Sequence, residues 1–359
     1  MDSIWETVSD NCSKVSILFN RSYLLFIFVS IAGSTIFTYY YFLYTHEYPP
    51  GSTGRIASYQ ADKVFQTRLL IPSLANFLKP TIPVISVCFG WLIPYPVDLQ
   101  VVLQLINIVF LSILLFSFPH LLACLNAETN HWASLFLLIP ITWNYIIING
   151  VVDGAGLFYC YDIPSLTFFV LGLIFFLKEK WAWFYPIFIL ACLNRESACF
   201  ISLSGFILLC NLSALTPKSF VHLNKNLALH ILAQATIWIS LRIYLSYIFR
   251  GNPGLFFEEP HSMFDFLSGL WTGEPHWAMQ NTYWFISLFA GIWVIPLILY
   301  KYLDSQGRRL ALVGFIYLIT LFFRSNMMET RVYNELNIII TACAITCLDK
   351  RIKLIKYNY

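Results

Sequence analysis

Long apolar runs alternate with short polar connections along the whole chain. A membrane-spanning helix needs about 20 consecutive, mostly apolar residues, and the sequence offers ten segments of this kind, several of them short. The pattern predicts an all-α fold, a polytopic transmembrane helix bundle of about ten spans (nine to eleven). The predicted spans are 22–44, 97–117, 131–149, 161–177, 181–193, 196–212, 226–247, 283–301, 308–324 and 334–348.

The stretch 68–94 is apolar but irregular. Lys79, Pro80 and Pro83 interrupt it, and proline breaks a simple spanning helix. We therefore expect one or two helices that lie in the membrane interface. The alternative is a span over 68–93, which would make eleven spans and invert every later loop.

Lysine and arginine are divided unequally between two alternating sets of loops, with thirteen in one set and six in the other. The positive-inside rule places the richer set in the cytoplasm. Both termini are then cytoplasmic, which requires an even number of spans. The richer set is Lys14, Arg21, Lys178, Lys180, Lys218, Lys225, Lys301, Arg308, Arg309, Lys350, Arg351, Lys353 and Lys356, and the poorer set is Arg55, Lys63, Arg68, Arg250, Arg324 and Arg331. Acidic residues gather on the predicted external side: Glu47, Asp62, Asp98, Asp153, Asp162, Glu258, Glu259, Asp265, Glu274, Glu329 and Glu335.

The domain organisation that follows is a single transmembrane domain over 1–359. It has a long external loop at 45–96 that bears the interfacial helices, and a second at 248–282. The N-terminal residues lack the features of a cleaved signal peptide. Sequons at Asn20 and Asn211 fall on the predicted cytoplasmic side, so they give no evidence about the compartment. We expect a bacterial inner membrane, with the endoplasmic reticulum membrane as the alternative.

Composition strengthens the membrane assignment. The chain is 58% hydrophobic and 11% charged, whereas a soluble domain carries about 25% charged residues. Its 32 Phe, 21 Tyr and 11 Trp residues suit lipid-facing helices and interface belts. The basic residues form no nucleic-acid-binding stripe, so no nucleic-acid partner is expected. The nine cysteines show no CxxC or Cys/His spacing, so disulfide and zinc sites are weakly indicated.

Four acids in the first two external loops are candidates for chemistry. Glu47 and Asp62 lie in the first loop, and Asp153 and Asp162 in the second. A carboxylate at a membrane surface can accept a proton from a hydroxyl or bind a divalent cation. Each also has an ordinary structural explanation. Asp162 stands just before Ile-Pro and an apolar run, where an acid caps a helix, and the others suit solvated loops and turns.

Charges also occur between two apolar runs with no long polar loop around them. The run 181–193 is short for a bilayer core of about 30 Å, so it either continues past Asn194 or stops inside the membrane. Arg195 and Glu196 follow directly. A charge at bilayer depth costs about 2.5–3.5 kcal/mol on insertion scales and is a functional candidate, whereas a short external turn would leave both residues in water.

A last charged segment lies near the C-terminus. Arg324, Glu329, Arg331 and Glu335 fall in one predicted external turn and at the start of the last span. Arg331 and Glu335 are four residues apart and can pair on one helix face. Arginines bind phosphate in a bidentate manner, so this turn predicts phosphate binding. A salt-bridge network that closes the bundle is the alternative.

The layout and four strings resemble the GT-C class of polytopic membrane glycosyltransferases, which use polyprenyl-phosphate-linked sugars. The shared layout is one early span, a long external loop with acids and interfacial helices, and a short second external loop with acids. The strings are TRLLIPSL at 67–74, YDIPSLTFF at 161–169, LNRESA at 193–198 and METRVYNEL at 328–336. The first loop lacks the adjacent acid pair of many members.

The resemblance implies roles for these residues. It assigns the base or metal ligand to Glu47 or Asp62, and a second acid to Asp153 or Asp162. Arg68, Arg195, Arg324 or Arg331 would hold the lipid phosphate, with Glu196, Glu329 and Glu335 in the same binding region. The implied partners are the lipid bilayer, a polyprenyl-phosphate-linked sugar and a glycan or lipid acceptor. The implied cofactor is a divalent cation, Mg or Mn, with Asp62 and Asp153 as its first candidate ligands.

The resulting hypothesis is a glycosyltransferase that moves a sugar from a polyprenyl-phosphate donor to a lipid-linked glycan, glycolipid or protein on the outer face. It requires ionised side chains from distant segments to meet in one external pocket. Two alternatives stay open. One is a flippase or secondary transporter, which would use the same charges for translocation. The other is a non-catalytic membrane scaffold, in which the charges only pair with one another.

Overall fold

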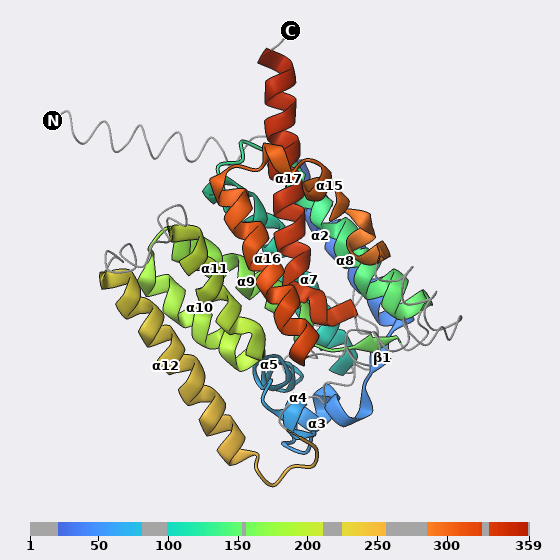
Figure 1. Cartoon of the computed structure of the whole chain (residues 1–359). Helices are drawn as coiled ribbons and strands as arrows, with labels where there is room; N and C mark the ends of the chain where they lie inside the picture. The colour runs from blue at the N-terminus through green and yellow to red at the C-terminus, as the bar shows by residue number, and fades with distance from the viewer. Residues whose placement is uncertain are drawn as a thin grey trace, which may run out of the picture.

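The structure, a computed structural model, describes residues 21–80, 99–152, 156–210, 225–255, 286–324 and 330–357. This part of the chain is mostly helical (Figure 1), so the predicted all-α class is confirmed for it. Its only strands are two-residue segments, β1 (His46–Glu47) and β2 (Leu157–Phe158), which pair in parallel.

The helices fall into long, short and connecting elements. The long ones are α2 (Arg21–Tyr44), α7 (Leu99–Cys124), α12 (Lys225–Ile248), α16 (Ser305–Arg324) and α17 (Asn334–Tyr357). Three consecutive elements, η2 (His131–Leu137), α8 (Leu138–Thr142) and the π-helix η3 (Trp143–Val152), form one further long segment. The shorter ones are α9 (Asp162–Leu177), α10 (Trp181–Asn194), η4 (Glu196–Ala198), α11 (Cys199–Leu209), η7 (Leu288–Gly291), α15 (Val294–Ile298) and η8 (Tyr300–Tyr302). The connections contain η1 (Pro49–Gly51), α3 (Thr53–Ala57), α4 (Lys63–Gln66), α5 (Leu70–Leu78) and η9 (Thr330–Tyr333).

Four described helical segments are long and apolar enough to cross a membrane: Arg21–Tyr44, Leu99–Cys124, His131–Gly150 and Lys225–Ile248. Several of them carry large apolar side chains on the outside of the bundle, such as Phe28 and Leu229. A soluble protein rarely exposes apolar surface on this scale, whereas lipid tails accept it. The fold therefore fits a protein in contact with a lipid bilayer.

The irregular apolar stretch at the start of 68–94 forms a short helix. α5 has nine residues and rises about 13 Å, too little to cross a bilayer. It ends at Leu78, and Lys79 and Pro80 form a turn. A helix followed by an interruption at these two residues is what the sequence predicts. The remainder, 81–98, lies outside the described residues.

The helix α10 ends at Asn194 and does not continue. Its 14 residues rise about 21 Å, less than the thickness of a bilayer core of about 30 Å. Arg195 has an extended backbone, and the chain then turns back through η4 into α11. The alternative in which the helix continues past Asn194 is therefore wrong, and Arg195 and Glu196 lie at the tips of two short helices.

The helix α9 is at the centre of the bundle. It contacts α7, α10, α11 and α17 (Figure 1), and every side chain from Asp162 to Val170 is buried. Because α9 is enclosed on all sides, its first turn carries Asp162 into the interior. This placement brings segments that are distant in sequence around one carboxylate.

Contacts between helix ends and connections distinguish the two ends of the bundle. At one end, the indole of Trp132 donates to Ser22, and Lys353 pairs with Glu128 at 3.0 Å. At the opposite end, β1 pairs with β2, and the Asn252 amide donates to the Ala61 carbonyl at 2.8 Å. The second end also holds the charged residues that the sequence singles out.

Close packing between α9 and α11 depends on glycine. A Cβ atom at Gly205 would lie 2.4 Å from the ring of Phe176 on α9. We expect Gly205→Ala to lower the stability of the protein by about 1–3 kcal/mol, because overpacking forces neighbouring atoms apart. The measurement is the thermal unfolding midpoint in detergent. Gly54→Ala is the control, since no atom beyond its chain neighbours and its own helix backbone lies within 4 Å of the added methyl group, and equal midpoints for the two variants would contradict the prediction.

Candidate functional site

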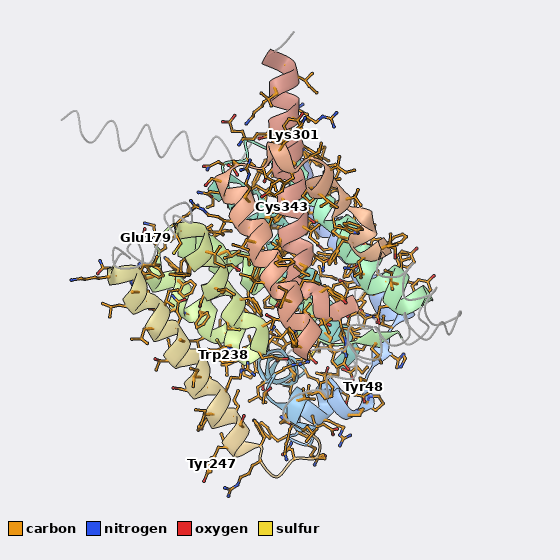
Figure 2. The ribbon with its side chains drawn as sticks, viewed as in Figure 1. Tyr48, Glu179, Trp238, Tyr247, Lys301 and Cys343 are labelled. Atoms are coloured by element: carbon orange, nitrogen blue, oxygen red, sulfur yellow. The ribbon has the colours of Figure 1, made fainter. Side chains whose placement is uncertain are left out.

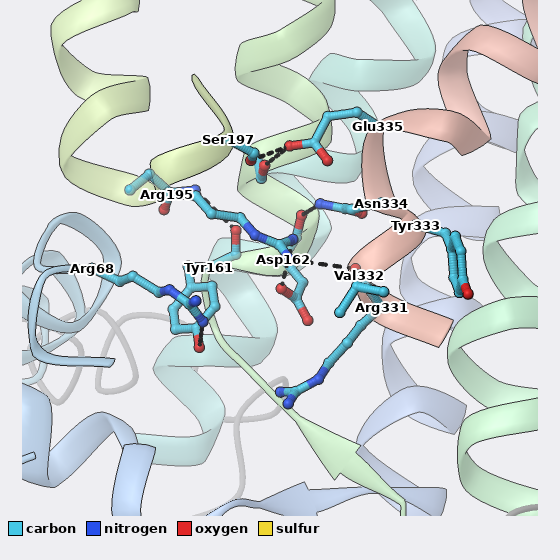
Figure 3. Close-up of polar contacts among 12 residues, drawn as sticks. Arg68, Tyr161, Asp162, Arg195, Ser197, Arg331, Val332, Tyr333, Asn334 and Glu335 are labelled. Atoms are coloured by element: carbon cyan, nitrogen blue, oxygen red, sulfur yellow. Dashed lines mark hydrogen bonds and ion pairs between the residues drawn. The ribbon is translucent and has the colours of Figure 1, made fainter. Parts of the chain in front are cut away.

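Seven buried or half-buried residues from five segments form a charge cluster at the second end of the bundle, and most of them are labelled in Figure 3. We use this name for Arg68, Tyr161, Asp162, Arg195, Glu196, Arg331 and Glu335. Arg68 follows α4, and the other residues come from the start of α9, the turn between α10 and α11, η9 and the first turn of α17. Three arginines and three acids give it balanced formal charges.

Asp162 and Arg195 form the centre of the charge cluster. Nη1 of Arg195 lies 3.2 Å from Oδ1 of Asp162, and both side chains are buried. Arg195 Nη2 also donates to the main-chain oxygen of Arg331 at 3.4 Å. Asn334 donates to the main-chain oxygen of Asp162 at 2.8 Å. Oδ2 of Asp162 accepts no hydrogen bond within the described part of the chain, so this carboxylate is buried with one oxygen unsatisfied.

The carboxylate of Asp162 does not cap its helix. Asp162 is the first residue of α9, the capping position belongs to Tyr161, and no side-chain cap bond forms there. The predicted acid at the helix N-terminus is present in the first turn of α9, but it forms no cap bond. The physical reason is that Asp162 lies one residue past the capping position, where its carboxylate meets Arg195 at the tip of α10.

Arg68 holds Glu196 in a bidentate ion pair. Nε of Arg68 donates to Oε2 of Glu196 at 3.0 Å, and Nη2 contacts Oε1. Nη1 donates to the hydroxyl of Tyr161 at 2.5 Å. Parallel N–H···O bonds of this kind fix both distance and direction. The Arg68 side chain is 7% exposed but that of Glu196 is 43% exposed, so Glu196 marks the open side of the charge cluster.

Arg331 and Glu335 do not form the predicted pair. Figure 3 shows their side chains pointing away from one another. The guanidinium of Arg331 lies 3.4 Å from the centre of the Tyr159 ring. The predicted spacing assumed one continuous helix, but Arg331 belongs to the 3₁₀-helix η9 and Glu335 to α17. The change of helix type between them removes the i,i+4 geometry.

Glu335 is held by hydroxyl groups. Ser165 donates to Oε1 at 3.1 Å, Ser197 contacts the same oxygen, and Tyr317 contacts Oε2. Hydroxyl donors satisfy a buried carboxylate in place of water. A cavity of about 10 Å³ lies beside Ser165, Ser197 and Glu335. This volume is at the lower limit for one water molecule, so a sugar does not fit there.

Glu47 and Asp62 lie outside the charge cluster. Oε1 of Glu47 accepts from the main-chain N–H of Thr53 at 3.1 Å and also contacts the Thr53 hydroxyl. Glu47 thus stabilises the start of α3. Asp62 precedes α4 without capping it, is half-buried and lies beside Gly254. No hydrogen bond or ion pair of its carboxylate occurs within the described residues.

Three predicted site residues are not placed. Asp153 and Glu329 lie outside the described residues, and the side chain of Arg324, the last residue of α16, is not described. A search of the described residues finds no group of three or more His, Cys, Asp or Glu side chains that could hold a metal ion. Of the two predicted metal ligands, only Asp62 can be located. Its single carboxylate fits a magnesium or manganese site only if water or a substrate phosphate supplies the other ligands.

A buried thiol lies beside this region. Cys160 lies between β2 and α9, and burial raises the pKa of its thiol above the ordinary value. A buried thiol of this kind packs as a small apolar residue.

Several residues of the site were not predicted from sequence. Tyr161 stands next to Asp162, and Ser197 two positions after Arg195, so the strings YDIPS and LNRESA contained a local signal for both. Asn194 also stands next to a predicted site residue, Arg195, and its amide donates to the Tyr161 main-chain oxygen at 2.9 Å. Tyr317 lies in the middle of α16, where nothing in the sequence marks it.

Comparisons with known proteins give no match, so function has to be inferred from the site. No protein-family model matches the chain, and neither a curated protein nor a solved structure matches it. The GT-C resemblance therefore remains an expectation from the sequence alone.

Proposed function

We propose that the chain is a membrane glycosyltransferase of GT-C type. It transfers a sugar from a polyprenyl-phosphate donor to a lipid-linked glycan, glycolipid or protein at the non-cytoplasmic face. The observation that supports this is the convergence of Arg68, Arg195 and Arg331, from three distant segments, around the buried Asp162. Guanidinium groups fixed by protein contacts are suited to binding a phosphate and stabilising it as it leaves.

We also propose the membrane arrangement that this function needs. The chain crosses a bacterial inner membrane ten times, with both termini in the cytoplasm. In support, Lys353 belongs to the lysine- and arginine-rich set of loops, and it lies with Glu128 at the end of the bundle opposite the charge cluster. The positive-inside rule then directs the charge cluster outward.

Of the two first-loop acids, Asp62 is the better candidate for the general base. The carboxylate of Glu47 is engaged by Thr53, whereas that of Asp62 has no such partner within the described residues. In the proposed reaction, Asp62 accepts the proton of the acceptor hydroxyl, whose oxygen attacks the anomeric carbon. The bond from that carbon to the phosphate oxygen breaks, and the arginines stabilise the negative charge of the polyprenyl phosphate. Asp162 is fully buried and holds Arg195 in position.

A transporter for the same lipid-linked sugar is the second candidate, because polar contacts continue from the charge cluster into the bundle. Asn334, which bonds Asp162, also contacts the hydroxyl of Tyr145. Further along α17, Asn337 accepts from the amide of Asn144 at 3.1 Å. A polar chain across helix interfaces is the kind of feature that translocation uses.

Reconstitution separates the two functions. The purified protein would be placed in liposomes with a labelled polyprenyl-phosphate sugar in one leaflet and an acceptor. A glycosyltransferase releases polyprenyl phosphate and labels the acceptor, whereas a transporter delivers the intact donor to the other leaflet. We expect the first result. If only intact donor moves, the transferase proposal fails, and if neither occurs, both proposals fail.

A further inference from the structure

The helix α12 carries a polar stripe on an otherwise lipid-facing surface. His230, Gln234, Trp238 and Arg242 recur at every fourth position and therefore share one face. Only Gln234 and Leu245 of this helix are buried. Polar side chains at such spacing within a membrane helix are costly and mark functional sites.

The stripe lies along α10 and reaches the turn between α10 and α11. The Trp238 indole donates to the main-chain oxygen of Glu196 at 2.9 Å, and Figure 2 labels Trp238 between α12 and these shorter helices. Nearer the other end of the bundle, the ring of His230 stacks on that of Trp181 with centres 3.7 Å apart. These contacts dock α12 against its neighbours.

Arg242 is different, because it brings a full charge into the same contact between α12 and α10. It contacts the main-chain oxygen of Cys192 in the last turn of α10, where helix carbonyls lack intrahelical partners. No carboxylate lies within ion-pair distance of Arg242 among the described residues, and its buried Nε has no hydrogen-bond partner there. At bilayer depth such a charge costs about 2.5–3.5 kcal/mol. Capping α10 does not require it, since a neutral donor would serve.

The charges around Arg242 favour binding of an anionic ligand. The charge cluster contains equal numbers of arginines and acids, and Arg242 interacts electrostatically with the half-exposed Glu196 at its open side. Among the described residues, Arg242 therefore adds one positive charge to those of the charge cluster, next to the lipid-facing surface. On that surface, apolar side chains such as Ile239 and Ile243 are exposed. A ligand with a long apolar tail and an anionic head matches both features.

We propose that the phosphate of an isoprenoid lipid reaches the charge cluster sideways from the bilayer, beside α12, and that Arg242 is its first contact. The tail stays in the membrane along the exposed face of α12, and the phosphate passes between Arg242 and Arg68 toward the cluster. The identity of the lipid rests on the proposed function, whereas the route rests on the position and charge of Arg242.

Binding of polyprenyl phosphate to the detergent-solubilised full chain, measured by native mass spectrometry, tests the proposal. We expect Arg242→Gln to weaken binding by about tenfold or more, because hydrogen bonds to charged groups are worth about 1.5–3 kcal/mol. Arg242→Lys, which keeps the charge, should lose less. Trp238→Phe is the matched control, since it removes only a neutral hydrogen bond between α12 and the turn after α10. The unfolding midpoint of each variant checks that it is folded.

Three ligand controls define the outcome. The proposal predicts that polyprenol without phosphate and inorganic phosphate without lipid both bind weakly, and that phosphatidic acid competes poorly. It is overturned if folded Arg242→Gln binds polyprenyl phosphate as tightly as the unaltered protein, or if any of the three ligands matches polyprenyl phosphate. Arg242-dependent binding without sugar transfer would support this inference while ending the glycosyltransferase proposal.

Discussion

Replacing Arg195 with glutamine is expected to destabilise the protein by about 3–5 kcal/mol, the cost of breaking a buried ion pair from one side. The substitution leaves the Asp162 carboxylate fully buried without its cation, and one oxygen of Asp162 already has no partner within the described residues. The expected result is a large fall in the thermal unfolding midpoint in detergent and a loss of monodisperse protein.

The double variant Asp162→Asn with Arg195→Gln tests the cause. If the uncompensated charge is responsible, removing both charges restores much of the stability, because an amide pair is far cheaper to bury. Lys350→Gln is the control for removing a cation, since Lys350 is 45% exposed and lies 3.9 Å from Asp304. A surface pair of this kind contributes about 0–1 kcal/mol. A double variant as unstable as Arg195→Gln would show that the charge itself is not the reason.

Asp62→Asn is expected to lower the rate of sugar transfer by about 10²–10⁴-fold, the usual contribution of a general base. The amide has nearly the same shape as the carboxylate but cannot accept the proton of the acceptor hydroxyl. The unfolding midpoint should stay unchanged, because the Asp62 side chain caps no helix and forms no ion pair in the described part of the protein. The measurement is the initial rate in the liposome assay.

Glu47→Gln is the matched comparison. Its carboxylate accepts from Thr53 at the start of α3, and the amide oxygen of glutamine can still accept that hydrogen bond, so the substitution should lower stability by less than about 1 kcal/mol. Its transfer rate should fall by much less than that of Asp62→Asn. The assignment of the base to Asp62 fails if Asp62→Asn transfers sugar at the normal rate, or if the two variants behave alike in both measurements.

The asymmetry between these two acids illustrates what sequence analysis could and could not predict. Both residues lie in the same connection between α2 and α7, and spacing alone gave no reason to prefer one. The structure separates them because η1 and α3 fold back so that the Thr53 amide meets Glu47. A contact of this type depends on the path of the loop, which no local pattern encodes.

The ion pairs show the same limit. Arg68 and Glu196 are 128 residues apart, and Asp162 and Arg195 are 33 apart. The sequence singled out all four as charges beside apolar runs but suggested no partners for them. The one partnership it did suggest, Arg331 with Glu335, assumed a continuous helix and is not formed.

The sequence by itself determined that this protein is helical and built for contact with lipid, and that charged residues stand at the ends of its apolar runs. Those properties follow from the length and composition of each run, because a helix satisfies its own backbone hydrogen bonds. Only the tertiary structure decided which charges meet. Packing around α9 selects which helix tips are neighbours, and a buried charge pairs with whichever opposite charge that packing brings within reach.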